Sequence, residues 1–149
     1  MFNTAAVIRH GAILGWYRKT KLHRKEHAFD AGRDYPVFDR ADWKFGINIC
    51  HDANVPEAAA TLSRQGARLI CYPLNNMLPP DVADGWRDRS VENLRRRAEE
   101  TGCWVVSSDV VGKHEAMICH GCTCIVNPAG EVVARVDEGS EGVALFDCD

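Results

Sequence analysis

Short apolar runs separated by polar and turn-forming residues recur along most of the chain, and they predict many short strands. Runs of four to eight apolar residues between turn signals are typical of buried strands, and strict apolar–polar alternation is typical of strands with one exposed face. The predicted strands cover residues 4–9, 12–18, 45–50, 68–73, 103–108, 122–126, 131–136 and 142–146. His10-Gly11 and the NPAG sequence at 127–130 are expected to form turns between consecutive strands.

A different spacing, with apolar residues three and four positions apart, predicts a first helix within residues 51–67. Asp52 or Asn54 can cap its start, Pro56 suits its first turn, and Gly66 can end it. Its apolar face is expected to contain Val55, Ala58, Ala59 and Leu62.

The same spacing predicts a second helix from Trp86 to Thr101, which Gly102 would end. Its apolar stripe is expected to contain Val91, Leu94, Ala98 and Thr101. Residues 19–35 and 75–85 are polar or rich in turn formers and are predicted to be loops. The order strand–helix–strand–helix–strand, followed by hairpins, predicts one α/β layered domain over residues 1–149.

Composition adds constraints on environment and partners. The 149 residues are 46% hydrophobic and 26% charged, which is enough apolar material to bury a core. The net charge of −3 does not suggest a nucleic-acid binder, and no apolar run reaches membrane-spanning length. The seven cysteines lie mostly in apolar runs. Arg9 and His10 interrupt the first apolar run of the chain, so no signal-peptide pattern is present. Free thiols in a reducing, cytoplasmic setting are therefore expected.

One cysteine has a distinctive position. In the sequence GINICHDAN, Cys50 ends an apolar run just before the predicted helix. The carboxyl end of a strand is where α/β folds place ligands and nucleophiles, and the positive end of a helix favours the thiolate form. The backbone N–H of His51 could also stabilise a developing oxyanion. On this pattern alone, Cys50 can equally be a small core residue.

Several motifs in order resemble the nitrilase, or carbon–nitrogen hydrolase, superfamily over essentially the whole chain. They are YRKTKL at 17–22, EHAFDAG at 26–32, GINICHDANVPE at 46–57, GARLICYP at 66–73, RRRAEETGCWVVSSDVVG at 95–112 and HGCTCIVNPAGEVVARV at 120–136. The resemblance implies a nitrilase-like α-β-β-α sandwich. It also implies hydrolysis of amides, carbamoyl groups or nitriles by a Cys–Lys–Glu triad, without a metal or cofactor.

Residue by residue, the resemblance makes Cys50 the nucleophile and Lys19 the cation that stabilises thiolate and oxyanion. Glu26 matches a further glutamate of the family, which would hold the lysine or orient substrate. His51 and Asn75 occupy positions expected to contact substrate. The sequence departs from the family at Lys21, where many relatives carry histidine.

The resemblance is incomplete in one respect, because no Asp or Glu precedes Glu26 to supply the family's general base. The chain matches the C-terminal part of the family domain, so the expectation is a truncated enzyme, one half of a split enzyme, or an inactive remnant. Loss of a positioned acid–base group costs on the order of 100- to 10,000-fold in rate. The edges and apolar faces left uncovered predict a homo-oligomer or a complementing chain.

Three other functions compete with hydrolysis. Cys119, His120, Cys122 and Cys124 form a dense set of potential zinc ligands, but a strand would spread three of them over about 13 Å. The triplet RRR at 95–97 could contact nucleic acid, although the acids after it suggest a solvated helix face. A non-catalytic module that keeps the fold and mediates interaction or assembly is the main alternative.

Overall fold

A six-stranded mixed sheet forms the centre of the computed structural model, which describes residues 1–147. Its strand order is β10-β9-β6-β5-β4-β3. The strands are β3 (Val37–Arg40), β4 (Trp43–Ile47), β5 (Leu69–Pro73), β6 (Trp104–Ser108), β9 (Cys124–Val126) and β10 (Val132–Arg135). The three central strands β4, β5 and β6 are parallel, and the remaining pairings are antiparallel.

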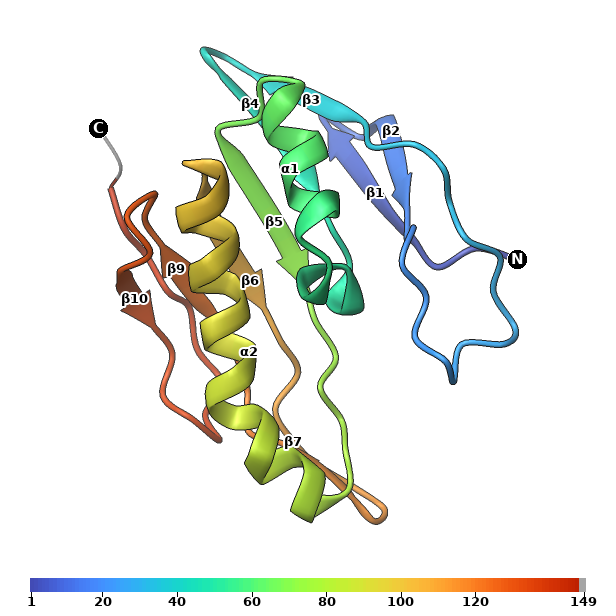
Figure 1. Cartoon of the computed structure of the whole chain (residues 1–149), viewed down its shortest axis with the longest axis vertical. Coiled ribbons are helices and arrows are strands. Elements are labelled where there is room, and N and C mark those ends of the chain that lie inside the picture. The colour runs from blue at the N-terminus through green and yellow to red at the C-terminus, as the bar shows by residue number, and fades with distance from the viewer. Residues whose placement is uncertain (148–149) are drawn as a thin grey trace.

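Both α-helices lie on the same face of this sheet (Figure 1). The 3₁₀ helix η1 (Cys50–Asn54) and α1 (Pro56–Arg64) connect β4 to β5, and α2 (Pro80–Thr101) connects β5 to β6. Parallel neighbours require such crossovers, which bury the apolar helix faces against the sheet. The core between helices and sheet includes Ala59, Leu62, Ile70, Leu94, Ala98 and Val105, each at most 1% exposed.

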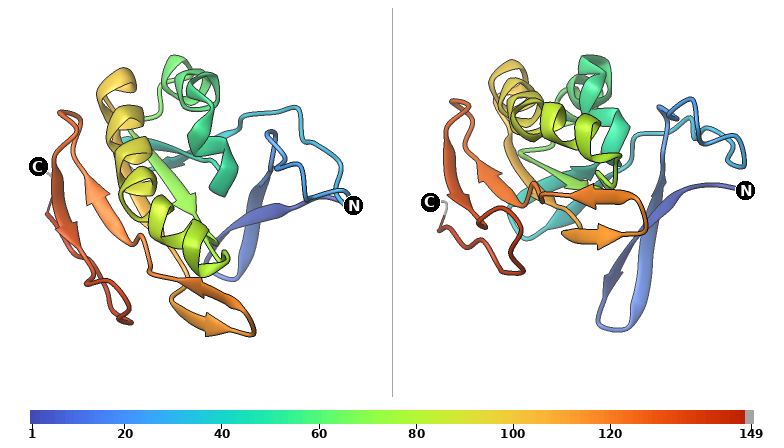
Figure 2. Two further views of the ribbon diagram at one scale, coloured as in Figure 1. Left: turned by 60° about the horizontal axis from the view of Figure 1, so that its bottom comes forward. Right: turned by 90° about the horizontal axis from the view of Figure 1, so that it is seen from below.

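A separate hairpin, β1 (Thr4–Arg9) and β2 (Ala12–Arg18), extends away from the sheet on the side opposite the helices (Figure 2). Its inner face packs on the sheet through Tyr17, which forms a second core cluster with Phe38, Ile47 and Ile49. Its outer face leaves large apolar side chains in solvent. A short hairpin of β7 (Gly112–His114) and β8 (Met117–Cys119) lies beyond the carboxyl end of β6.

The α/β layered architecture predicted from the sequence is confirmed, as are the strands around residues 4–9, 12–18, 43–47, 69–73, 104–108, 124–126 and 132–135. The predicted strand at 142–146 is wrong. Val143 and Leu145 there are each 81% exposed, because no neighbouring strand within residues 1–147 pairs with this segment. The strands β3, β7 and β8 were not predicted, since their sequences VFDR, GKH and MIC contain no apolar run of four residues.

The predicted helix starts need correction. Val55 is the N-cap of α1 and Pro56 its first residue, so neither Asp52 nor Asn54 caps it. The helix α2 begins at Pro80, six residues before the expected Trp86, because proline at the first helical position loses no hydrogen bond. Neither helix in residues 1–147 combines the length and apolar character that crossing a membrane requires.

Candidate active site

Cys50 lies in a turn with unusual backbone geometry at the carboxyl edge of the parallel strands. Its φ angle is +45°, in the left-handed region. Among residues 1–147, the other non-glycine residues with positive φ are His10, Ala41 and Glu115, which lie in tight hairpin turns. Such a conformation costs roughly 1–3 kcal/mol and persists only where the surroundings enforce it, often at functional sites. We call residues 49–54 the Cys50 turn.

The carboxylate of Asp52 enforces this geometry. Asp52 is fully buried, and its Oδ2 accepts hydrogen bonds from the Ile49 backbone N–H at 2.7 Å and the Tyr17 hydroxyl at 2.8 Å. Its Oδ1 accepts from the backbone N–H of Lys21 at 2.8 Å. Asp52 therefore fastens the Cys50 turn to the end of β2. The sequence pattern suggested only a capping role for this residue.

The Asp52 carboxylate also alters the chemistry of its partner. Burial, followed by the negative charge of Asp52, raises the pKa of Tyr17 well above its ordinary value. Tyr17 therefore keeps its proton and remains a hydrogen-bond donor at physiological pH. A second support comes from α2, where the buried Arg97 donates from Nη1 to the carbonyl of Ala53 at 2.9 Å.

Lys19 and Glu26 form an ion pair beside this turn. Lys19 is only 3% exposed, and its Nζ lies 2.7 Å from Oε2 of Glu26. Glu26 also accepts from the backbone N–H of His23 at 2.6 Å and from Nδ2 of Asn3 at 3.2 Å. Partial burial opposes ionisation, but these hydrogen bonds, led by that of Lys19, hold the pKa of Glu26 below its usual value.

The loop that carries this pair is closed by Gly32, the last residue of the EHAFDAG motif. Its backbone N–H donates to the Lys19 carbonyl at 2.8 Å. A Cβ at this position would lie 2.2 Å from the carbonyl oxygen of Arg18, closer than any real contact. Only glycine lets the loop return this close to β2, so Gly32 is a site-shaping residue that the sequence analysis did not select.

His51 belongs to the Cys50 turn and contacts the loop that carries the Lys19–Glu26 pair. Its ring packs edge-on against the ring of His23, with centroids 5.2 Å apart. Burial, then the nearby charges of His23 and Lys19, lower the pKa of His51, so it is neutral at physiological pH. Because the Lys19–Glu26 pair acts on His51, the pair lies close to the residue that follows Cys50.

The expected substrate residue Asn75 approaches the thiol through its backbone. Its carbonyl oxygen lies 3.9 Å from Sγ of Cys50, because the carboxyl ends of β4 and β5 meet at one edge of the sheet. The Asn75 side chain instead accepts from the backbone N–H of Met77 at 3.2 Å. Within residues 1–147, Glu26 is the partner of Lys19 Nζ, and no hydrogen bond joins Nζ directly to Cys50.

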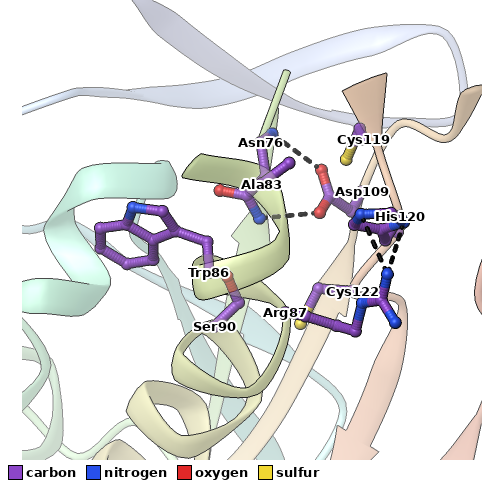
Figure 3. A pocket seen from close by; sticks show the side chains of 10 residues that line it. Asn76, Ala83, Trp86, Arg87, Ser90, Asp109, Cys119, His120 and Cys122 are labelled. Carbon is purple, nitrogen blue, oxygen red and sulfur yellow. Dashed lines mark hydrogen bonds between the residues drawn. The ribbon is translucent and has the colours of Figure 1, made fainter. Parts of the chain in front are cut away.

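Cys119 and Cys122 lie apart from Cys50, around a cavity of about 20 Å³, which is the size of one water molecule. We call it the Cys119 cavity; its lining includes Trp86, Arg87, Asp109, Cys119, His120 and Cys122 (Figure 3). Burial raises the pKa of Asp109, which accepts from Asn76 Nδ2 at 2.8 Å, and burial raises the pKa of Cys119 to about 11. Across residues 1–147, no three His, Cys, Asp or Glu side chains are arranged to hold a metal ion.

Comparisons with known proteins agree with this architecture. A sequence model of the carbon–nitrogen hydrolase family matches residues 1–149. A nitrilase from Pyrococcus abyssi is 31% identical over 151 residues, which cover 100% of this chain and 54% of that protein. An N-carbamoylputrescine amidase from Arabidopsis thaliana is 31% identical over 166 residues, covering 99% and 56%.

Solved structures confirm the nitrilase-like α/β fold. The crystal structure of a carbon–nitrogen hydrolase from Helicobacter pylori superposes with a TM-score of 0.84 at 22% identity, over 94% of this chain and 54% of that one. The chain thus spans about half the length of the relatives it matches. Since the family match extends over every residue, the chain belongs to the carbon–nitrogen hydrolase family.

Proposed function

We propose that this chain carries the nucleophilic half of a hydrolase for non-peptide carbon–nitrogen bonds in amides, carbamoyl compounds or nitriles. The observation that carries the proposal is the ion pair of the buried Lys19 with the partly buried Glu26 beside the strained Cys50 turn, with Asp52 linking this turn to the segment that follows β2. A buried ammonium is costly unless it has a partner, and here the partner is the Glu26 carboxylate.

The proposed reaction begins with attack of the Cys50 thiolate on the substrate carbon. For an amide, a C–S bond forms and the carbonyl oxygen becomes an oxyanion, which the Lys19 ammonium and the His51 backbone N–H would stabilise. Collapse of this intermediate breaks the C–N bond, and the amine leaves with a proton taken from solvent water. Water then attacks the thioester, releasing the acid and restoring the thiol.

Glu26 is better suited to hold Lys19 than to transfer protons. It already accepts three hydrogen bonds, and they keep its carboxylate ionised. Residues 1–25 contain no Asp or Glu that could take the role of general base. We therefore expect this chain alone to form a covalent adduct at Cys50 much faster than it turns over, since a positioned acid–base group contributes about 100- to 10,000-fold.

We further propose that the chain associates with a second copy or with a complementing polypeptide. The β1–β2 hairpin exposes Ile8, Ile13, Leu14 and Trp16 by 52–64%, with Leu14 and Trp16 on its outer face and Ile8 and Ile13 on the other. This apolar surface also supports the alternative function, an interaction or assembly module without turnover.

The six cysteines described form no disulfide among residues 1–147, as a reducing cytoplasmic setting would require.

Alkylation with iodoacetamide, mapped by mass spectrometry, tests the proposed nucleophile. Cys50 should react first among the thiols, and Lys19→Ala should slow its reaction at pH 7 about ten-fold or more, because loss of a neighbouring cation disfavours the thiolate. Cys103→Ala, which removes a thiol 1% exposed, is the control and should leave the Cys50 rate unchanged. Equal labelling of all thiols, or no effect of Lys19→Ala, would refute the proposal.

A further inference from the structure

A chain of side-chain amides reaches His51 from the long helix. Asn93 of α2 donates from Nδ2 to Oδ1 of Asn54 at 2.6 Å, and Nδ2 of Asn54 lies 2.9 Å from Nδ1 of His51. We propose that Asn93 and Asn54 are positioning residues that keep the single ring proton of His51 on Nε2. This nitrogen is then a neutral hydrogen-bond donor for an acceptor atom of the substrate.

The direction of these hydrogen bonds fixes the position of the proton. The Oδ1 of Asn54 is occupied by the Asn93 amide, so the side of Asn54 that faces His51 is its NH₂ group. An NH₂ group only donates, and a ring nitrogen that accepts from it carries no hydrogen. Nδ1 of His51 is therefore the acceptor, and the proton of the neutral imidazole resides on Nε2.

Burial, followed by the groups around His51, keeps the ring neutral. The ring of His23 packs against it from the 19–35 loop, and the Lys19–Glu26 pair and Asp52 complete the titratable groups that act on it. Burial comes first in lowering the pKa of His51, and the lowering by His23 and Lys19 outweighs the raising by Glu26 and Asp52. Protonation of Nδ1 would also break the Asn54 contact, so the amide chain and the electrostatics favour the same state.

The other ring nitrogen of His51 has no partner in the described part of the chain. Among residues 1–147 no protein group forms a hydrogen bond with Nε2 of His51, which lies on the opposite side of the ring from Asn54. An N–H donor next to Cys50 matches a carbonyl oxygen or a nitrile nitrogen, the acceptors of the proposed substrate classes. This match between the N–H donor and the substrate rests on the proposed function, whereas the tautomer of His51 does not depend on it.

Nuclear magnetic resonance of ¹⁵N-labelled protein tests the tautomer without requiring activity. Long-range ¹H–¹⁵N spectra, with His51 assigned from a His51→Gln variant, should show an unprotonated Nδ1 and a protonated Nε2. Asn93→Asp should reverse this pattern. A carboxylate accepts only, so it turns the Asn54 NH₂ group towards itself and presents Oδ1 to His51, which must then carry its proton on Nδ1.

Asn93→Ala provides a second variant that only releases Asn54, and it should give signals averaged between the two tautomers. A protonated Nδ1 in the wild type, or the wild-type pattern in both variants, would overturn the proposed chain. Either result would leave the iodoacetamide test of Cys50 and Lys19 unaffected, so the two proposals can fail separately.

The donor role is measured by comparing two alkylating agents at Cys50. Iodoacetamide offers a carbonyl acceptor and iodoethane does not. Asn93→Asp should lower the ratio of their rate constants about five-fold, the typical effect of one hydrogen bond, because a donor is replaced by an unprotonated nitrogen. An unchanged ratio would overturn the donor role of Nε2 even if the tautomer reverses.

Discussion

The Cys50 turn and the Cys119 cavity both combine cysteine with polar side chains, and they differ in how far the thiol is exposed. In the Cys50 turn, the thiol is partly exposed on a strained residue, beside an ion pair and a neutral histidine. Around the Cys119 cavity, Cys119 and Cys122 are at most 3% exposed. The cysteines that lie closest together in the sequence are therefore buried, whereas the cysteine at the edge of the parallel strands is partly exposed and stays the predicted nucleophile.

The buried carboxylate of Asp52 should have the largest effect on the Cys50 turn. Asp52→Ala leaves the Ile49 N–H, the Lys21 N–H and the Tyr17 hydroxyl without their acceptor, and each unsatisfied buried group costs about 1–3 kcal/mol. We expect urea denaturation to show a loss of about 3–5 kcal/mol. Asp39→Ala removes an exposed carboxylate from β3 and should change stability by less than about 0.5 kcal/mol. Equal effects of the two substitutions would contradict the assigned role.

The close approach of the 19–35 loop to β2 predicts a smaller effect for Gly32→Ala. The added Cβ would collide with the Arg18 carbonyl, so the loop must move, at a cost of about 1–3 kcal/mol. Alkylation of Cys50 should slow at the same time, because Lys19 is displaced. The matched control is Gly85→Ala in α2, where a Cβ meets nothing within 4 Å and alanine favours the helix. Normal Cys50 labelling in Gly32→Ala would indicate that the loop does not position Lys19.

The Lys19–Glu26 pair should contribute stability that depends on pH. Glu26 has a lower pKa in the folded chain than when unfolded, so its contribution is present above the unfolded value of about 4.3. That contribution is lost as pH falls through the folded pKa. The difference in unfolding free energy between wild type and Glu26→Gln should therefore be larger at pH 7 than at pH 3. A difference independent of pH would mean that the pair is not maintained in solution.

The Cys119 cavity should give the smallest effect on Cys50. Burial comes first in raising the pKa of Cys119 to about 11, so this thiol is almost entirely protonated at pH 7. Cys119→Ala should change the alkylation rate of Cys50 by less than about two-fold, because the two thiols share no contacts in the described chain. Rapid labelling of Cys119 in the native protein would remove the contrast between the two regions.

The local sequence pattern was sufficient to predict the central strands and to place Cys50 at the end of one of them, because short apolar runs are buried as strands. The pairing of Lys19 with Glu26 was implied by the family motifs and is present as a contact. The role of Asp52 could not be deduced in this way, since its bond to Tyr17 joins residues 35 positions apart. The Asn93–Asn54 contact spans 39 positions and leaves no periodic signal in the sequence.

Apolar character alone also misled at residues 142–146. Val143 and Leu145 alternate with small or polar residues as strand residues do, yet a strand needs a partner edge, which sequence pattern does not reveal. The reverse holds at Pro79-Pro80, where residues typical of loops begin the longest helix of the described chain. In both cases tertiary context outweighed local preference.

The central claim is that the Lys19 ammonium stabilises the thiolate of Cys50. The most direct measurement is the alkylation rate of Cys50 in wild type and in Lys19→Met, compared at pH 7 and pH 10. The wild type should react about ten-fold faster or more at pH 7, and the ratio should fall towards one at pH 10, where the thiol ionises without help. A ratio close to one at pH 7, or the same ratio at both pH values, would contradict the claim.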